Sequence, residues 1–228
     1  ANLPYGDKTE EEVYALTKAG VEYLFQRECS LVLVACNTAS AETLRTLQSE
    51  LLIGEYRAKR ILGMIVPTVE TLVAHNPSSA LLLATRRTVE SNKYQLELNK
   101  LQSNLTLTQV VASNLVPLIE LGDIKLATEE ALRLIEKAGQ GSEVIILGCT
   151  HYTEIKEALQ KNYPHKLVLS QDEIIPAKLA LYLEKHPEIV SDLTTTGERT
   201  VHLTEHKPYY DRILQQLLSG TLLSSDTS

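Results

Sequence analysis

The chain has 228 residues, of which 43% are hydrophobic, and its formal net charge is −7 at pH 7. The length allows one large domain or two small ones, and the apolar fraction is sufficient for a buried core. The negative charge and the lack of a Lys- or Arg-rich run argue against nucleic acid as a partner. No apolar run approaches the roughly 18 residues of a membrane span and no leader pattern is present, so we expect a soluble, cytoplasmic protein without a membrane partner. The three cysteines lack the spacing of a disulfide framework, and we expect them to be reduced.

The first part of the chain predicts two helices and two strands. Thr9 and Glu12 have the capping-box spacing at the start of a helix that ends near Arg27. After this helix we expect, in order, a strand at 30–36, a helix at 41–52, a loop at 54–59 and a buried strand at 61–66 that Pro67 closes.

The remainder of the chain continues the same alternation after a turn at 76–79. The predicted strands lie at 80–85, 105–111, 143–149, 167–170 and, as a strand-like segment, 201–204. The predicted helices lie at 89–101, 127–138, 154–162, 173–185 and 209–218. Strands that alternate with helices along a whole chain indicate an α/β fold.

Two segments of the chain share one pattern, LVLVACNTAS at 31–40 and EVIILGCTHY at 143–152. Each is an apolar run that ends in a cysteine and leads through small polar residues into a helical stretch. In a parallel sheet, ligands bind at the carboxyl ends of strands, where the next helix offers free N–H groups. We therefore expect Cys36 and Cys149 at such ends, each with its thiol pKa lowered by a helix N-terminus. The cysteines are 113 positions apart (149 minus 36), which fits two similar α/β lobes with the thiols facing each other across a cleft.

Each of these residues also has a purely structural interpretation. A single cysteine after a strand is more often a small core residue, but the repeated pattern favours function for Cys36 and Cys149. For Asn37, Thr38 and Thr150, helix capping explains the residue type as well as ligand binding does, and the two roles are compatible.

Other polar and sulfur-containing residues are less distinctive. His151 could be a hydrogen-bonded core histidine, but next to a candidate thiol we favour a role in tuning that thiol or carrying protons. Glu120 alone fits an exposed helix carboxylate better than a site residue. Cys29 is interpreted as a packing residue, and the segment 92–94 as a solvated helix face.

The sequence offers no obvious place for a nucleotide, because it has neither a GxxxxGK motif nor a GxGxxG motif after a strand. A zinc site made of Cys36, Cys149 and His151 is the main alternative, since two thiolates and an imidazole are a known ligand set. Only one residue separates the last two, which is shorter than the usual ligand spacing. We expect neither a metal nor a cofactor.

Several short motifs, taken together, resemble the cofactor-independent aspartate/glutamate racemase family along essentially the whole chain. Each motif alone is weak, but their order and spacing in combination are highly specific. They are Pro4-Tyr5-Gly6, Ala35-Cys36-Asn37-Thr38, Glu120 in its VPxxE setting and Leu147-Gly148-Cys149-Thr150-His151.

The resemblance implies inversion of the α-carbon of glutamate, a reaction that supplies D-glutamate for bacterial peptidoglycan. It implies that Cys36 and Cys149 are the acid/base residues, acting on the D and L enantiomer respectively. Glu120 and His151 would assist proton transfer. The implied substrate-binding residues are Tyr5, Gly6, Asn37, Thr38, Thr150 and His151. The chemistry agrees, because inversion takes a proton from one face of the carbon and delivers one to the other, which needs two opposed groups.

The resemblance also implies a domain plan and one difference. We expect a first lobe of residues 1–63 and 170–228, a second lobe of 64–169, the active site between them, and a homodimer. Members of the family begin with a strand and an Asp-Ser-Gly segment that this chain does not contain, and we expect a less stable and less active first lobe as a result. The alternatives are a racemase for aspartate, a zinc hydrolase, and a non-catalytic protein that binds an amino acid.

Overall fold

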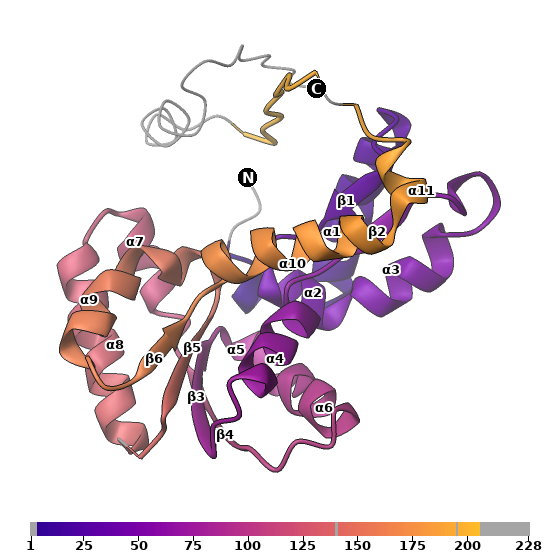
Figure 1. Ribbon diagram of the computed structural model, residues 1–228. Coiled ribbons are helices and arrows are strands. Elements are labelled where there is room, and N and C mark those ends of the chain that lie inside the picture. Colours follow the sequence, from indigo (N-terminus) through magenta and orange to yellow (C-terminus); the bar gives the residue numbers. More distant parts are fainter. Residues whose placement is uncertain (1–3, 140, 195, 206–228) are drawn as a thin grey trace.

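The computed structural model of the chain describes residues 4–139, 141–194 and 196–205 (Figure 1). The described strands form two separate parallel sheets, one with the order β1-β2 and one with the order β4-β3-β5-β6. Every strand pair in both sheets is parallel. The prediction of an α/β fold is therefore confirmed.

The two-stranded sheet belongs to the N-terminal part of the chain. Three helices surround it, and their inward apolar residues form one hydrophobic cluster around Val32, Leu47 and Ile61, with Cys29 packed at its edge. The elements are η1 (Tyr5–Asp7), α1 (Glu10–Gln26), β1 (Leu31–Leu33), α2 (Asn37–Glu42), α3 (Leu44–Leu51), η2 (Gly54–Tyr56) and β2 (Arg60–Leu62).

The four-stranded sheet contains the longer strands, and helices cover both of its faces (Figure 1). Its elements are α4 (Ile65–Ala74), β3 (Ser79–Ala84), α5 (Arg86–Glu90), α6 (Lys93–Lys100), β4 (Thr106–Val111), α7 (Leu115–Glu120), α8 (Ile124–Ala138), β5 (Val144–Gly148), η3 (Thr150–Ile155), α9 (Lys156–Asn162) and β6 (Leu167–Leu169). Two further helices, α10 (Gln171–Lys185) and α11 (Pro187–Val190), follow the sheet.

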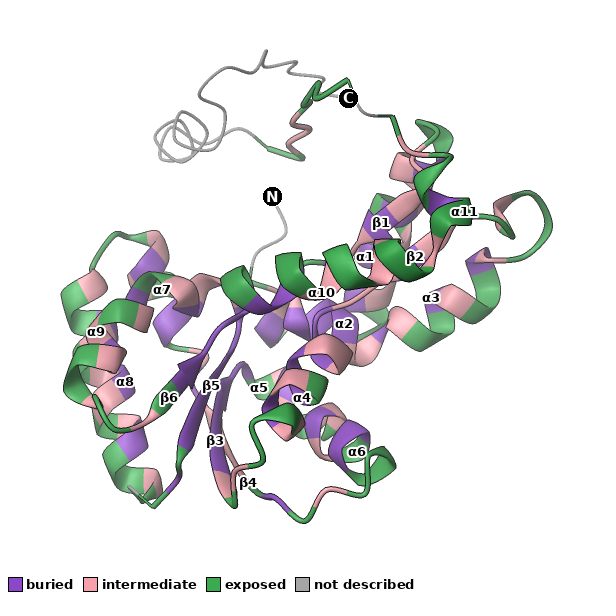
Figure 2. Ribbon diagram, in the orientation of Figure 1, coloured by how far each residue is buried: buried purple, intermediate pink, exposed green. Residues whose placement is uncertain are grey.

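The central strands β3 and β5 are buried on both faces, as Figure 2 shows. Side chains alternate along a strand, so one strand serves two cores. Leu81 and Leu83 of β3 pack in the cluster under α7 and α8, whereas Leu82 packs in the cluster under α4 and α6. Because β3 and β5 are parallel and packed on both faces, their carboxyl ends lie side by side at the same end of the sheet.

Helix α10 connects the two parts of the molecule. In Figure 1 it extends from the four-stranded sheet toward β1 and β2. Its residues Ile174 and Ile175 pack in the cluster under α4 and α6, to which Leu33 of β1 also contributes. The division into lobes of 1–63 plus 170–228 and 64–169 stays a prediction, and part of the first lobe lies outside the described residues.

The structure corrects several element boundaries. The capping box of Thr9 and Glu12 is present at the start of α1. The expected strand at 61–66 is wrong in its second half, because β2 ends at Leu62 and Pro67 lies in the first turn of α4, where a proline needs no N–H partner.

Two predicted helices are interrupted. The helix expected at 41–52 begins earlier and breaks at Thr43. The helix expected at 89–101 is two helices, separated near Asn92, which has a left-handed φ of 51°. No strand is assigned at 201–204, and the helix expected at 209–218 lies outside the described residues. In the part of the chain that the structure describes, no helix is both long and apolar enough to cross a membrane.

Candidate active site

Cys36 lies between β1 and α2 and is the N-cap residue of that helix. The backbone N–H groups of Thr38 and Ala39 and the hydroxyl of Thr38 favour its thiolate. Burial nevertheless outweighs them and raises the thiol pKa above its ordinary value. The expectation of a lowered pKa is therefore wrong for this residue in the absence of a ligand. The helix N-terminus acts in the expected direction, but desolvation of the charged form is the larger effect.

Cys149 occupies the equivalent position after β5 and is 8% exposed. Burial raises the pKa of its thiol to about 12, so here too the expected lowering is wrong. The backbone N–H of His151 opposes the shift, and the negative charge of Cys36 adds to it. A charge on one thiol is therefore felt by the other, although the two residues follow strands of different sheets.

His151 and Glu120 extend the Cys149 side of the site. The Nδ1 atom of His151 is 3.8 Å from the Sγ atom of Cys149, and its Nε2 atom is 3.1 Å from the Oε1 atom of Glu120. Glu120 is the last residue of α7 and is only half-buried, so the interpretation as a freely exposed helix carboxylate is wrong. The three side chains form a continuous chain from carboxylate through imidazole to thiol.

Tyr5 and Gly6 lie on the Cys36 side. Burial raises the pKa of the Tyr5 hydroxyl, and the charge of Cys36 raises it further. Both side chains pack against the same hydrophobic cluster. A Cβ atom on Gly6 would lie 2.9 Å from the Cβ atom of Thr85, so this position has no room for a side chain. The segment therefore packs directly on the loop that follows β3.

The side chains that follow Cys36 do not cap α2, so the capping explanation for Asn37 and Thr38 is wrong. The hydroxyl of Thr38 is 2.9 Å from that of Thr85, and Thr88 lies 3.1 Å beyond Thr85. Thr150 begins η3 without capping it and is half-buried. The threonine cluster joins the first cysteine segment to the end of β3.

Asn37 is buried and has two partners that the sequence did not reveal. Its amide forms two hydrogen bonds with the amide of Gln171, both 2.7 Å long, and its Oδ1 atom accepts a 2.8 Å hydrogen bond from Tyr94. Tyr94 is fully buried, so the interpretation of 92–94 as a solvated helix face is wrong for this residue.

Of the additional residues around the site, Thr85 could have been predicted from the sequence, whereas Tyr94 and Gln171 could not. Thr85 follows the buried strand β3, as the cysteines follow theirs, so the polar residue after ALLLA was a usable signal. Tyr94 and Gln171 had no such signal, because both lie in helices whose packing depends on other parts of the chain. Within the described ranges, no group of three His, Cys, Asp or Glu side chains is placed to hold a metal ion, and this includes the proposed zinc ligands.

The family model for Asp/Glu/hydantoin racemases matches residues 4–176 of this chain. The chain belongs to this racemase family. It is 34% identical over 217 residues to a glutamate racemase of Ruegeria pomeroyi, covering 87% of this chain and 80% of that protein. It is 31% identical over 227 residues to a glutamate racemase of Persephonella marina, covering 97% and 81%.

Solved structures agree with this membership. A glutamate racemase isoform from Bacillus anthracis superposes with a TM-score of 0.86 at 25% identity, covering all of this chain and 84% of the other. A glutamate racemase from Francisella tularensis in complex with D-glutamate gives a TM-score of 0.83 at 22% identity, with the same coverage, which concerns the fold alone.

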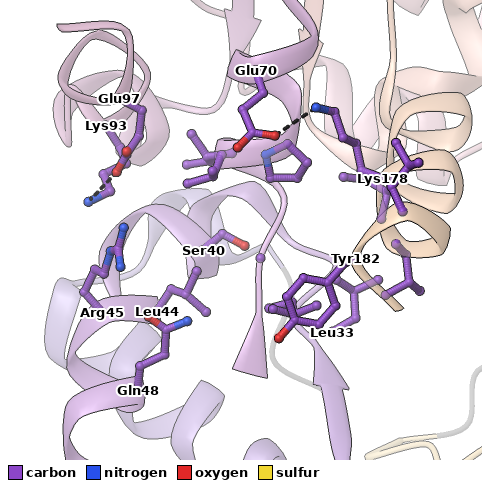
Figure 3. Close-up of a pocket in the computed structure, with 18 of the residues that line it drawn as sticks. Leu33, Ser40, Leu44, Arg45, Gln48, Glu70, Lys93, Glu97, Lys178 and Tyr182 are labelled. Atoms are coloured by element: carbon purple, nitrogen blue, oxygen red, sulfur yellow. Dashed lines mark hydrogen bonds and ion pairs between the residues drawn. The ribbon is translucent and has the colours of Figure 1, made fainter. Parts of the chain in front are cut away.

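This member of the racemase family also has a cavity of about 410 Å³ that none of the nine predicted site residues lines (Figure 3). It lies among α3, α4, α6 and α10. Two ion pairs border it, Glu70 with Lys178 at 2.8 Å and Lys93 with Glu97 at 3.3 Å. The cavity and the candidate active site are therefore separate features that share helices α2, α6 and α10.

Proposed function

We propose that the chain catalyses the interconversion of L- and D-glutamate by proton transfer between two thiols. The observation that carries this proposal is the pair Cys36 and Cys149. Each follows a strand of a parallel sheet, the two strands belong to different sheets, and a charge on Cys36 raises the pKa of Cys149. Two such groups can serve opposite faces of one carbon atom.

Because both thiol pKa values are raised, the bound substrate itself would have to favour ionisation of the thiol. A thiol with its pKa near 12 is almost entirely protonated at neutral pH and cannot remove a proton. The positive α-ammonium group of a bound amino acid would favour the thiolate through its charge. The His151–Glu120 pair next to Cys149 offers a path for the proton that the thiol releases.

The remaining residues would bind the ends of the substrate. Asn37, Thr38 and Thr150, with nearby backbone N–H groups, can donate hydrogen bonds to carboxylate oxygens, and Tyr5 and Gly6 would close the Cys36 side. As the acid/base residues, Cys36 would act on D-glutamate and Cys149 on L-glutamate. The product would enter peptidoglycan synthesis in the cytoplasm, and the enzyme would work as a homodimer without metal or cofactor.

The relatives support glutamate over aspartate as the substrate. The sequence relatives reported above are named glutamate racemases, and so is the structure at 25% identity. An aspartate racemase from Picrophilus torridus has a TM-score of 0.60 at 22% identity, which concerns the fold alone.

The decisive experiment follows the α-proton of glutamate in deuterated water by NMR and the change of handedness by circular dichroism. We expect deuterium at Cα together with racemisation, and a higher kcat/KM for glutamate than for aspartate. Cys36→Ser and Cys149→Ser should each lower racemisation by at least about 100-fold, because serine is a far weaker acid and base. A protein that only binds its ligand would exchange nothing, and near-normal turnover in either variant would remove the two-thiol mechanism.

A further inference from the structure

Three buried polar side chains meet behind the Cys36 segment. Asn37, Tyr94 and Gln171 are each at most 2% exposed. They come from α2, α6 and α10. Neither Tyr94 nor Gln171 belongs to the proposed substrate-binding set, and both contact the side chain of Asn37. A buried polar group is costly unless its hydrogen bonds are satisfied, so these contacts hold the three side chains together strongly.

The contacts use most of the hydrogen-bonding capacity of Asn37. An asparagine amide has two acceptor lone pairs on its oxygen and two N–H donors on its nitrogen. Tyr94 and the Nε2 atom of Gln171 donate to the oxygen, which uses both lone pairs. The nitrogen donates one hydrogen to the Oε1 atom of Gln171. One N–H donor therefore remains for a ligand.

Tyr94 and Gln171 together fix which way the amide of Asn37 faces. Burial raises the pKa of its hydroxyl, so the group stays protonated and is available as a donor. Its ring is part of the apolar core under α4 and α6 and cannot turn away without disrupting that core. A rotation of the Asn37 amide by 180° would set its N–H groups against the Nε2 donor of Gln171 and its oxygen against the Oε1 acceptor, so both hydrogen bonds of that pair would be lost, and the Tyr94 hydroxyl would lose the oxygen to which it donates.

From this geometry we infer that Tyr94 and Gln171 are positioning residues, which hold the Asn37 amide so that it presents only an N–H donor to the substrate. This inference rests on the proposed function. The chemical class recognised is an oxygen acceptor such as a carboxylate, and a donor group at the same place is rejected, because no lone pair of Asn37 is free to accept from it.

The test combines kinetics with direct observation of the Asn37 side chain, using the whole chain. Tyr94→Phe keeps the buried ring and removes only the hydroxyl. We expect KM for both enantiomers of glutamate to rise about three- to ten-fold, with a smaller change in kcat, because one neutral hydrogen bond is lost. In an Asn37→Ala background the same substitution should leave KM unchanged, since its effect passes through Asn37.

A second buried tyrosine offers a matched stability control. The hydroxyl of Tyr152 donates a 2.7 Å hydrogen bond to the carbonyl of Ala112, and its side chain is also fully buried. The loss of stability in Tyr152→Phe measures the cost of removing a buried tyrosine hydroxyl in this fold. A rise in KM for Tyr94→Phe at a comparable loss of stability is then not a consequence of unfolding.

The outcomes separate this inference from the proposed function. If the wild-type chain does not racemise glutamate, the proposed function fails, and the inference is decided by the side-chain amide NMR signal of Asn37 alone. That signal should be single and slow to exchange in the wild type, and should shift and exchange at least about ten-fold faster in Tyr94→Phe. If the signal is unchanged, or if KM rises equally in the Asn37→Ala background, the inference is overturned.

Discussion

The buried thiol of Cys149 predicts a loss of stability at alkaline pH. Its pKa is raised from an ordinary 9.0 to about 12 by burial. Above pH 9 the unfolded chain loses this proton and the folded chain keeps it. The contribution of this thiol to the free energy of unfolding is therefore fully present below pH 9 and is lost as the pH rises toward 12. Because each pKa unit is worth about 1.4 kcal/mol, the loss is on the order of 1 kcal/mol at pH 10 and about 4 kcal/mol at its limit.

The assay is urea unfolding at pH 7 and pH 10, followed by far-ultraviolet circular dichroism, on the wild type and on Cys149→Ala. Tyrosines and lysines also titrate near pH 10, but they do so in both proteins, and the comparison cancels them. Between the two pH values, we expect the wild type to lose on the order of 1 kcal/mol more than the variant. Equal losses would refute the reasoning, because the thiol would then ionise as easily in the folded state as in the unfolded chain.

Two further substitutions test the Cys149 side of the site. Glu120→Gln should lower kcat/KM by about ten-fold or more, since the neutral amide stabilises a protonated His151 less well than the carboxylate does. The decrease should be equal in both directions, because the equilibrium constant between enantiomers is one, and unchanged rates would remove Glu120 from the mechanism. Gly148→Ala should destabilise the fold by about 1–3 kcal/mol, because the new Cβ would lie 2.6 Å from a methyl of Leu82 and 3.0 Å from a backbone carbonyl of β3. Gly141→Ala, where the Cβ meets nothing within 4 Å, is the control, and equal melting temperatures would contradict this explanation.

The features that the sequence predicted well are those determined by local pattern. A β-branched apolar run followed by a cysteine and small polar residues predicts a strand before Cys36 and before Cys149. Strand β5 ends at Gly148, directly before Cys149, whereas β1 ends at Leu33 and so is shorter than the expected strand at 30–36. The capping box of Thr9 and Glu12 is likewise a matter of four consecutive residues. The motifs found in this way are also those on which the resemblance to the racemase family depends.

The prediction was wrong where a local pattern was ambiguous. The apolar run at 61–66 fits a buried strand and the start of a buried helix equally well, since periodicity cannot separate the two over so few residues. The structure divides it, with Ile61 in β2 and Ile65 in α4. Pro67 then supports the helix, because a proline in the first turn has no intrahelical partner to lose.

The site residues that sequence reasoning missed are those whose role depends on distant contacts. Tyr94 is 57 positions from Asn37, and Gln171 is 134 positions from it. Each belongs to a helix with polar residues on several sides, so the buried face could not be identified before the packing was known. The thiol pKa values were mistaken for a related reason, since desolvation depends on everything that surrounds a group.

The parallel pairing of the four-stranded sheet has a consequence for how the chain folds. Strand β5, which carries Cys149 at its end, lies between β3 and β6. Because parallel neighbours cannot be joined by a tight hairpin, β5 forms its ladders only after long loops have closed. Until then two apolar strands, β3 and β5, have unpaired edges that can associate with other chains. The segment that supplies one of the two thiols therefore depends for its pairing on strands distant in the sequence, and exposed edges of β3 and β5 are the expected sites of aggregation while the chain refolds.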